Sequence, residues 1–321
     1  MKTGTPEAQP MSCSIVIRAY NEERHIGRLL DGIQHQQRLD PEVILVDSGS
    51  TDRTLEIAAR YPVRVLHIEP IVFSFGRSLN LGIAAARHER IVIASAHVYP
   101  VYPDWLERLL APLDDPNTAL SYGRQRGDGE THFSEQQIFA RWFPEASNLR
   151  QAYPFCNNAN AAIRRSIWER IPYDENLTGL EDLAWARLAM EQGFGVAYTA
   201  EAEVVHVHQE TPEGVYNRYR REAMAYKQIF PSERFTFADF LSLLGSNILS
   251  DLRNARRGKS LRNSMTGIFW FRWMQFWGTY QGYRRPGLLT EQLRRTFYYP
   301  HHPAAQPAGF DRDVEPIRYG D

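Results

Sequence analysis

The 321-residue sequence predicts an α/β protein with a mostly parallel sheet flanked by helices, followed by a C-terminal helical extension. Short apolar runs at residues 14–17, 43–46, 63–68 and 90–95 alternate with helical patterns. Most of these runs are continuously apolar, as in strands that are buried on both faces of a parallel sheet. After Thr211 the sequence changes to long helical segments that are rich in aromatic residues.

These patterns divide the chain into four parts. We expect a flexible tail at 1–11, an α/β domain at 12–211, a helical extension at 212–300 and a loose tail at 301–321. Within the α/β domain the later elements are less regular than the early ones. They are predicted as strands at 119–123 and 159–163, a helix at 181–192, and two short strands at 196–200 and 204–208.

Composition excludes several classes of protein. The net charge of −1 argues against a nucleic-acid partner. Cys13 and Cys156 form neither a disulfide framework nor a zinc-binding spacing, which fits a reducing compartment. The first ten residues lack the apolar segment of a signal peptide, and no apolar run is long enough to span a bilayer. We therefore expect a cytoplasmic protein.

Two polar clusters follow predicted strands. Residues 19–22 (Ala-Tyr-Asn-Glu) follow the first strand, and residues 47–52 (Asp-Ser-Gly-Ser-Thr-Asp) follow the second. Ligands of open α/β sheets bind beyond the carboxyl ends of the strands. Taken alone, the second cluster also suits a turn with a helix cap. The position of both clusters at strand ends favours a ligand site.

A carboxylate pair, Glu181-Asp182, begins a predicted helix. Free amides and the helix dipole favour negative charge there, so capping is one interpretation. A carboxylate at such a position can also accept a proton from an attacking hydroxyl.

The ordered series of motifs closely resembles the nucleotide-sugar half of family 2 glycosyltransferases, whose Rossmann-related fold is called GT-A. The resemblance runs from about Ser12 to His208 and includes residues 75–80 (Phe-Gly-Arg-Ser-Leu-Asn) and 158–160 (Asn-Ala-Asn). It implies an inverting glycosyltransferase that moves a sugar from a nucleotide diphosphate sugar to a hydroxyl of a glycan or lipid-linked acceptor. The implied setting is the synthesis of a surface polysaccharide.

The resemblance also implies residue roles. Asp182 would be the general base, and Glu181 would tune or orient it. The nucleotide-sugar donor would contact Ala19, Tyr20, Glu22, Asp47, Ser48, Arg77, Asn80, Ser95 and His97. Asn158, Asn160 and Trp185 would contact the acceptor or the sugar. Some of these residues have alternative interpretations. Arg77 also suits a solvated helix start, Asn158 and Asn160 also suit a turn, and Trp185 also suits packing in the core.

One motif departs from the family pattern. Members usually carry Asp-x-Asp after the fourth strand, where two carboxylates hold Mg²⁺ or Mn²⁺, and this chain has Ser95-Ala96-His97. A metal site would then depend on His97 with help from His206-Val207-His208, of which we select His208 as the second ligand. Imidazoles suit Mn²⁺ better than Mg²⁺. In the alternative, His97 bonds a phosphate oxygen directly, without metal.

The C-terminal third combines basic and aromatic residues. From Asp251 to Pro300 there are ten Lys and Arg residues against two acids, interleaved with eight Phe, Trp and Tyr residues at 269–283. This composition suits the headgroup region of an anionic membrane, at the inner face of the cell membrane. It equally suits aromatic packing onto the α/β domain with solvated arginines, or a homo-oligomer interface.

Two rival functions remain open. The loss of Asp-x-Asp suits a non-catalytic nucleotide- or glycan-binding module, although the intact Glu181-Asp182 pair argues against it. The basic and aromatic extension suits a polyprenyl-phosphate sugar transferase.

Overall fold

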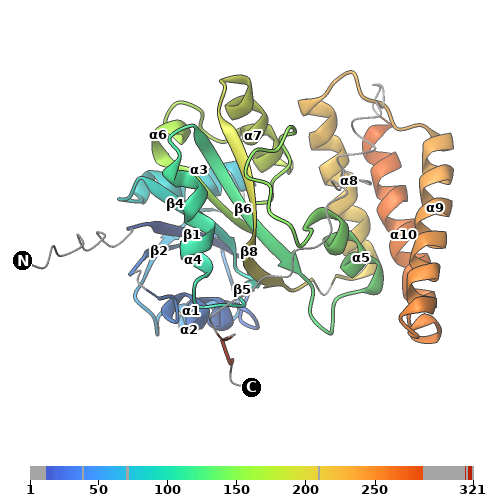
Figure 1. The fold of residues 1–321 in the computed structure, drawn as a ribbon, viewed down its shortest axis with the longest axis horizontal. Helices are drawn as coiled ribbons and strands as arrows, with labels where there is room; N and C mark the ends of the chain where they lie inside the picture. The colour runs from blue at the N-terminus through green and yellow to red at the C-terminus, as the bar shows by residue number, and fades with distance from the viewer. Residues whose placement is uncertain are drawn as a thin grey trace, which may run out of the picture.

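A computed structural model of the chain describes residues 12–37, 40–69, 72–208, 210–284, 315 and 317–319. A sheet with helices on both of its faces makes up one side of the molecule, and three long helices stand beside it (Figure 1). The prediction of an α/β fold with a sheet flanked by helices and a C-terminal helical extension is confirmed.

A single eight-stranded sheet forms the centre of the α/β part, in the order β3-β2-β1-β4-β7-β6-β8-β5. Its strands are β1 (Ser14–Ala19), β2 (Glu42–Asp47), β3 (Val63–His67), β4 (Arg90–Ser95), β5 (Val98–Pro100), β6 (Thr118–Arg126), β7 (Asn160–Arg164) and β8 (Gly195–His206). The first four strands are mutually parallel, as predicted. In the second half, β7 runs antiparallel to both β4 and β6, so the sheet as a whole is mixed.

Helices cover both faces of the sheet and form the extension. They are α1 (Ile26–Gln34), α2 (Thr54–Ala58), α3 (Phe75–Ala85), α4 (Trp105–Leu110), the 3-10 helix η2 (Ala111–Asp114), α5 (Phe133–Trp142), α6 (Arg165–Trp168), α7 (Glu181–Glu191), α8 (Pro212–Ile229), α9 (Phe237–Arg257) and α10 (Leu261–Tyr283). Successive residues of β1 show why its run is apolar throughout. Val16 packs into the cluster beneath α3 and α7, whereas Ile15 and Ile17 pack into the cluster beneath α1 and α4.

Three details differ from the predicted elements. The short strands expected at 196–200 and 204–208 are one continuous strand, β8, whose polar residues 201 and 203 (both Glu) do not interrupt it. Helices α4 and α5 and the short strand β5 were not predicted. The two helices are short, and the buried residues of α5 include Ser134 and Glu135, so no apolar stripe marks it in the sequence.

The helical extension packs closely on itself and on the α/β part. Gly278 and Gly282 of α10 lie one turn apart, and a side chain at either would collide with the backbone of α8 at Tyr216 or Arg220. These glycines therefore allow α8 to dock directly on α10, which fixes the face that α8 turns toward the sheet. Leu177 and Leu183 share an apolar cluster with α8, α9 and α10.

One arginine of the extension is buried. Arg272 Nε lies 2.7 Å from Asp251 Oδ2, and their side chains are 2% and 0% exposed. Ser134 of α5 donates to the same carboxylate oxygen at 2.7 Å. The interpretation that the arginines of this region are solvated is therefore wrong for Arg272.

The predicted tails lie largely outside the described residues. Of the predicted loose tail at 301–321, the short piece at 317–319 is bound to the α/β part. Ile317 donates its amide to the carbonyl of Val101, and the ring of Tyr319 packs edge-on against Tyr99. Even the longest described helices, α9 and α10, lack the apolar character that a membrane-spanning helix requires.

Candidate functional site

A polar cleft of about 510 Å³ opens between the sheet and α8. Residues of β1, β4, β8, α7 and α8, and of the loops beside them, line it. Seven of the predicted site residues meet there: Glu22, Ser95, His97, Asn158, Glu181, Asp182 and His208. The structure thus joins the acidic pair, the histidines and the first strand end in one site.

Asp182 lies in the first turn of α7. Its carboxylate accepts the backbone amide of Asn158 at 3.0 Å and that of Leu183 at 2.8 Å. Burial and the charge of Glu181 raise the pKa of Asp182 to about 7, although the two amides and Arg18 act in the opposite direction. A carboxyl group with such a pKa is suited to take a proton near neutral pH.

The turn before α7 holds a strained residue. Leu180 has φ = 56°, in the left-handed region that residues other than glycine rarely adopt. Such conformations tend to occur at functional sites, because the surrounding structure has to hold them in place. Here the turn sets the start of α7 and with it the position of Asp182.

Glu181 is held by an arginine on the first strand. Arg18 Nη1 lies 3.1 Å from Glu181 Oε1, and both side chains are largely buried. The Arg18 guanidinium also lies 4.7 Å from the centre of the Phe75 ring. Arg221 of α8 lies 4.7 Å from the same ring, so two cations from distant parts of the chain share one aromatic side chain in the cleft wall.

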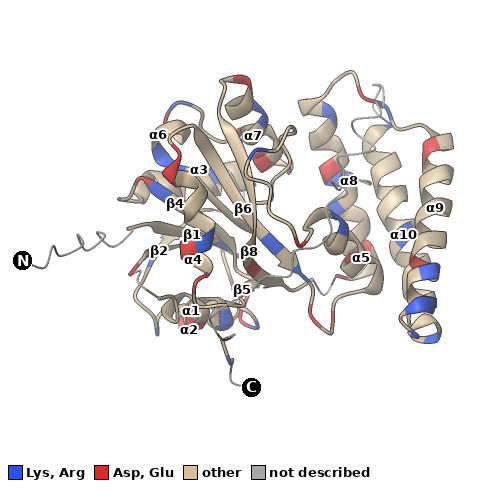
Figure 2. Ribbon diagram, viewed as in Figure 1, with Lys and Arg blue, Asp and Glu red and all other residues tan. Residues whose placement is uncertain are grey.

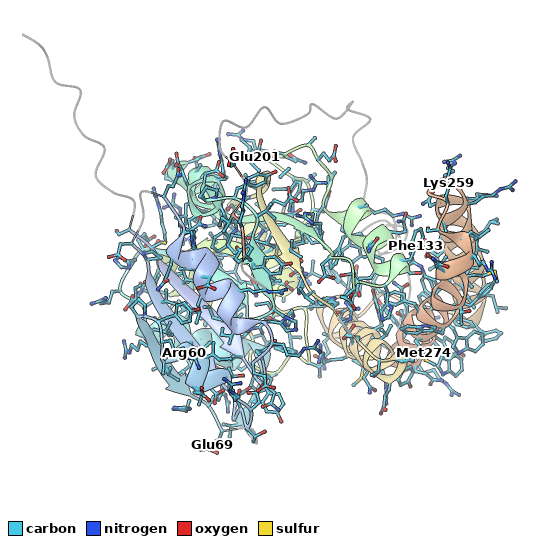
Figure 3. The ribbon with its side chains drawn as sticks, turned by 90° about the horizontal axis from the view of Figure 1, so that it is seen from below. Arg60, Glu69, Phe133, Glu201, Lys259 and Met274 are labelled. Carbon is cyan, nitrogen blue, oxygen red and sulfur yellow. The ribbon has the colours of Figure 1, made fainter. Side chains whose placement is uncertain are left out.

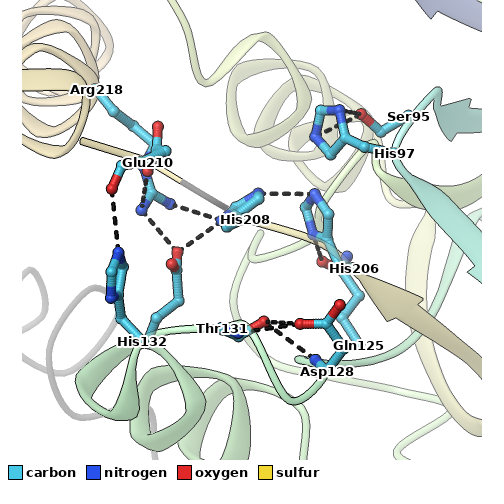
Figure 4. Close-up of polar contacts among 11 residues, drawn as sticks. Ser95, His97, Gln125, Asp128, Thr131, His132, His206, His208, Glu210 and Arg218 are labelled. Carbon is cyan, nitrogen blue, oxygen red and sulfur yellow. Dashed lines mark hydrogen bonds and ion pairs between the residues drawn. The ribbon is translucent and has the colours of Figure 1, made fainter. Parts of the chain in front are cut away.

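Three histidines that line the cleft lie close together (Figure 4). The rings of His97 and His206 stack with centroids 5.1 Å apart, and those of His206 and His208 lie 4.0 Å apart. The three residues each offer a ring nitrogen, and these atoms lie within 4.8 Å of one another. The predicted pair of His97 and His208 is thus joined by His206. Burial and the nearby positive groups lower the pKa of His206 well below its usual value, so its ring is neutral.

Each of these imidazoles has an oxygen acceptor at its outer nitrogen. The Nδ1 atom of His97 lies 2.7 Å from Glu22, that of His206 lies 2.7 Å from the Gln125 amide oxygen, and that of His208 lies 2.6 Å from Glu135. An oxygen acceptor fixes the proton on Nδ1 and leaves the lone pair on Nε2. Such outer acceptors accompany metal-bound histidines. The residues therefore fit a divalent cation held by three neutral imidazoles.

A network of buried charged residues holds the His208 side chain in place. Arg218 of α8 lies 2.7 Å from Glu135 and 2.6 Å from Glu210. Burial alone would raise the pKa of Glu135, but the charge of Arg218 and the hydrogen bonds from Arg218 and His208 outweigh it and lower that pKa to about 2. Glu135, which lies on α5, is therefore ionised at neutral pH and binds the His208 ring. Arg218 binds the same carboxylate and so connects α8 to it.

Four residues predicted to contact the nucleotide lie beside this cleft, at the ends of β1 and β2. Ala19 accepts the amide of Ser48 at 3.0 Å, which joins the two strand ends. Asp47 is 2% exposed and accepts the amides of Gly49 and Ser50, so its carboxylate shapes the turn after β2. The Tyr20 side chain is 57% exposed.

Two of the predicted phosphate-side residues are placed elsewhere. Arg77 is exposed on α3 and pairs with Glu175 at 2.7 Å. Asn80 bonds the Tyr173 backbone, Glu175 and the Trp168 indole. Neither residue is among those that line the cleft, so the structure does not bring them together with the acidic pair and the histidines. They hold the loop at 173–175 against α3.

Two of the predicted acceptor residues are structural. Trp185 is 1% exposed, and its indole donates to the carbonyl of Ile171, so packing is the correct interpretation. Asn160 is fully buried, and its amide group bonds Trp105 and the backbone at Ala202. Asn158 alone of the three lines the cleft, and its side-chain nitrogen has no hydrogen-bond partner among the described residues.

The cleft residues that were not predicted as members of the site include Arg18, His206, Arg218 and Arg221. Arg18 interrupts the apolar run of β1, which was a usable signal. His206 belongs to the noted His-Val-His sequence, whose alternation already places both imidazoles on one face. Arg218 and Arg221 lie in an ordinary charged stretch of α8, where no sequence signal separates them from solvated residues.

Comparisons with known proteins agree with this fold. Residues 14–171 match the family described as "Glycosyl transferase family 2". An O-antigen chain rhamnosyltransferase, WbaN of Salmonella anatum, is 28% identical over 222 residues, which is 65% of this chain and 70% of that protein. A dolichyl-phosphate hexose transferase of Haloferax volcanii is 31% identical over 190 residues, which is 57% of this chain and 79% of that protein.

Among solved structures, the mannosyltransferase PcManGT of Pyrobaculum calidifontis, in complex with GDP-Man and Mn²⁺, superposes with a TM-score of 0.55. It is 20% identical, and the match covers 84% of each chain. This likeness concerns the fold and agrees with the predicted GT-A architecture. The chain belongs to glycosyltransferase family 2.

Proposed function

We propose that this glycosyltransferase moves a sugar from a nucleotide diphosphate sugar to a hydroxyl of a glycan or lipid-linked acceptor, with inversion, during the synthesis of a surface polysaccharide. The observation that carries the proposal is the Asp182 carboxylate in the wall of the cleft, with a pKa raised to about 7. The names of relatives such as the O-antigen chain rhamnosyltransferase support the setting.

In the proposed reaction Asp182 takes the proton of the acceptor hydroxyl. The hydroxyl oxygen forms a bond to the anomeric carbon, and the bond between that carbon and the diphosphate oxygen breaks on the opposite face. The nucleoside diphosphate leaves with the bonding electrons. The amides of Asn158 and Leu183 hold the carboxylate in place, and this positioning lowers the entropic cost of the proton transfer.

Positively charged groups in the cleft would stabilise the negative charge of the diphosphate. His97, His206 and His208 would hold a divalent cation, whose chemistry is to stabilise the charge that develops on the leaving diphosphate. Neutral imidazoles favour a borderline ion such as Mn²⁺ over Mg²⁺. Arg18 and Arg221 on the Phe75 ring add fixed positive charge in the same cleft.

The nucleoside would lie at the ends of β1 and β2, beside the cleft. Tyr20 offers an exposed ring for stacking on a base. Asp47 and Ser48 shape the adjoining turn. Glu22 already bonds His97, so it would link the nucleoside end of the site to the three histidines.

A second candidate is supported by the relative named as a dolichyl-phosphate hexose transferase. In that case the acceptor would be a polyprenyl phosphate. Its oxygen is already ionised at neutral pH and would need no base. The two candidates therefore differ in their dependence on Asp182.

The test is a donor and acceptor screen with the purified protein. UDP-, GDP-, dTDP- and CMP-sugars are incubated with and without Mn²⁺, first alone and then with a polyprenyl phosphate or a lipid-linked sugar. We expect donor hydrolysis with one nucleotide class and transfer to the lipid-linked sugar. Absence of both hydrolysis and transfer with every donor that binds would instead indicate a non-catalytic module.

A further inference from the structure

The outer face of the α9–α10 hairpin exposes large apolar side chains. Leu241 and Leu249 of α9 are 52% and 48% exposed, and Met265, Phe269 and Trp273 of α10 are each 47% exposed. The last three follow one another at intervals of four residues, so they form one stripe along the helix. A contiguous exposed apolar surface of this kind marks an interaction site.

A groove of about 550 Å³ runs between the two helices at this stripe. It is almost entirely apolar and is lined by Ile248, Met265, Thr266, Phe269, Trp270, Trp273 and Met274. It is separate from the polar cleft, with which it shares no residue. The following inference therefore does not rest on the proposed function.

The end of the hairpin next to this stripe is strongly basic. Its five cations are all exposed: Arg253, Arg256, Arg257, Lys259 and Arg262. Figure 2 shows the basic residues gathered at the lower end of α9, and Figure 3 shows Lys259 projecting outward from the end of the hairpin. From Leu252 to Arg284 the chain carries no acid, and Asp251 is buried against Arg272.

The distribution of charge on the hairpin indicates which kind of partner binds this face. A second copy of the chain bound through this face would present the same cations and the same apolar stripe. The described hairpin has no exposed acid that could pair with the cations of the other copy. A bilayer that contains anionic lipids supplies both missing complements, since headgroups attract Lys and Arg while the interfacial region accepts Trp, Phe, Leu and Met. The long aliphatic part of an arginine side chain also allows its guanidinium group to reach the lipid headgroups while the helix itself lies deeper in the interface.

We infer that the α9–α10 hairpin is a docking surface for anionic membranes. The hairpin lies flat in the interface, with Met265, Phe269 and Trp273 among the upper acyl chains and the five cations at the phosphate level. It does not cross the bilayer. This contact would hold the cleft beside a membrane surface.

The first test uses the unmodified protein and 100 nm vesicles. Sedimentation with phosphatidylcholine vesicles is compared with sedimentation with vesicles that also contain one quarter phosphatidylglycerol. We expect at least tenfold stronger partitioning to the anionic vesicles, weakened by 0.5 M NaCl. Trp273 is the only exposed tryptophan of the seven in the chain, all of which lie in the described part. Its fluorescence should shift to the blue and be quenched by brominated acyl chains.

Variants separate the two features of the surface. Combined Arg256→Glu, Arg257→Glu and Lys259→Glu should lower partitioning to anionic vesicles at least tenfold. Phe269→Ser with Trp273→Ser should lower it similarly and remove the bromolipid quenching. Two controls match these changes on the α/β part: Arg53→Glu with Arg60→Glu, and Leu149→Ser, all at exposed positions. Neither control should change partitioning.

Two results would overturn the inference. One is equal, weak partitioning of the unmodified protein to both kinds of vesicle. The other is a stable dimer in light scattering that Trp273→Ser dissociates, because the face would then join two copies of the chain. The vesicle and quenching measurements need no variant, so they decide the question even if a substitution prevents folding.

Discussion

The Nε2 atoms of His206 and His208 lie 2.8 Å apart, although the Nδ1 atom of each ring faces an oxygen acceptor. Two lone pairs at this distance repel unless a proton or a cation lies between them. The Nε2 atom of His97 is also 3.1 Å from the Ser95 hydroxyl, on the same side of the cleft. A cation bound to both rings would remove this repulsion, so the three-histidine cluster is the part of the site where we expect dependence on a metal.

We therefore predict that His206→Ala weakens Mn²⁺ binding at least tenfold. The turnover of this variant should be much lower than that of the unmodified protein, and EDTA should not lower it further. Calorimetry with Mn²⁺ and activity in EDTA measure the two effects. His35→Ala, at the exposed C-terminal end of α1, is the control and should change neither. Full activity of the unmodified protein in EDTA would exclude the metal site and leave His97 as a direct donor to phosphate. A fully active His97→Ala would exclude both roles.

Asp182→Asn should reduce turnover by on the order of 10²–10⁴-fold, because the amide cannot accept the proton of the acceptor hydroxyl. Nucleotide binding should be retained, because we place the nucleoside at the ends of β1 and β2, away from Asp182. The asparagine oxygen can replace only one of the two carboxylate oxygens that accept the amides of Asn158 and Leu183. Single-turnover rates and nucleotide affinity are measured together. If Asp182→Asn transfers sugar to a hydroxyl acceptor at a near wild-type rate, Asp182 is not the base. If it keeps a near wild-type rate only with a phosphate acceptor, the second candidate function is supported.

The pH dependence should report the environment of Asp182. The base acts when it is ionised, so kcat/KM should rise with pH through about 7. Glu181→Gln removes a charge that raises the pKa of Asp182, so the rise should shift to lower pH with a modest loss of rate. Arg18→Gln should shift it to higher pH. Glu175→Gln, outside the cleft, is the control, and identical profiles for all four proteins would contradict the assignment.

The same shift has a consequence for stability. The pKa of Asp182 lies above its unfolded value near 3.8, so the folded state binds the proton more tightly, and this contribution is lost as the pH rises through about 7. Asp182→Asn should therefore raise the melting temperature at pH 8 relative to the unmodified protein, and less so at pH 5. An equal change at both pH values would indicate that the carboxyl group is not buried in this way.

Asp47→Ala should weaken nucleotide affinity by roughly 1–3 kcal/mol. The carboxylate holds the amides of Gly49 and Ser50, so its loss would loosen the turn at which we place the nucleoside. Calorimetry with the nucleotide found in the donor screen measures the effect. Asp115→Ala removes a similar turn-forming carboxylate far from the cleft and should leave the affinity unchanged. Equal affinities for both variants would take Asp47 out of the site.

The buried pair of Arg272 and Asp251 should matter for stability. Asp251→Ala leaves the Arg272 charge without a carboxylate in a buried position, which typically costs about 3–5 kcal/mol of unfolding free energy. The exposed pair of Arg187 and Glu191 is the matched control, and Glu191→Ala should cost less than about 1 kcal/mol. Chemical denaturation measures both. Similar small losses would show that the extension does not depend on this pair.

Much of the fold could be read from local sequence. The apolar runs of β1, β2 and β4 are buried on both faces, and that burial is what predicts parallel strands. The ordered motifs predicted the family and the Glu181-Asp182 pair. The antiparallel direction of β7, by contrast, depends on the path of the chain between β6 and β7, and no local pattern encodes it.

The membership of the site was decided by tertiary structure. Arg77 and Asn80 belong to a motif that the family resemblance assigns to the diphosphate, yet Glu175, nearly a hundred residues later, binds both. Trp185 has the right place in the sequence for a sugar platform, but the helix turns its indole into the core. A side chain on a helix faces a ligand or the core according to what packs against that helix.

The sequence by itself determined the alternation of strands and helices, the family and the acidic pair, because each depends on neighbouring residues or on residues a few positions apart. Only the tertiary structure decided that His206 joins His97 and His208, that Arg18 and Arg221 share Phe75, and that Arg218 ties α8 to Glu135. For the two arginines of α8 the physical reason is the docking of α8 onto α10 at Gly278 and Gly282, which places charges from the extension in a cleft built by the sheet. For the histidines it is the pairing of β5 with β8, which sets Val98 opposite His206.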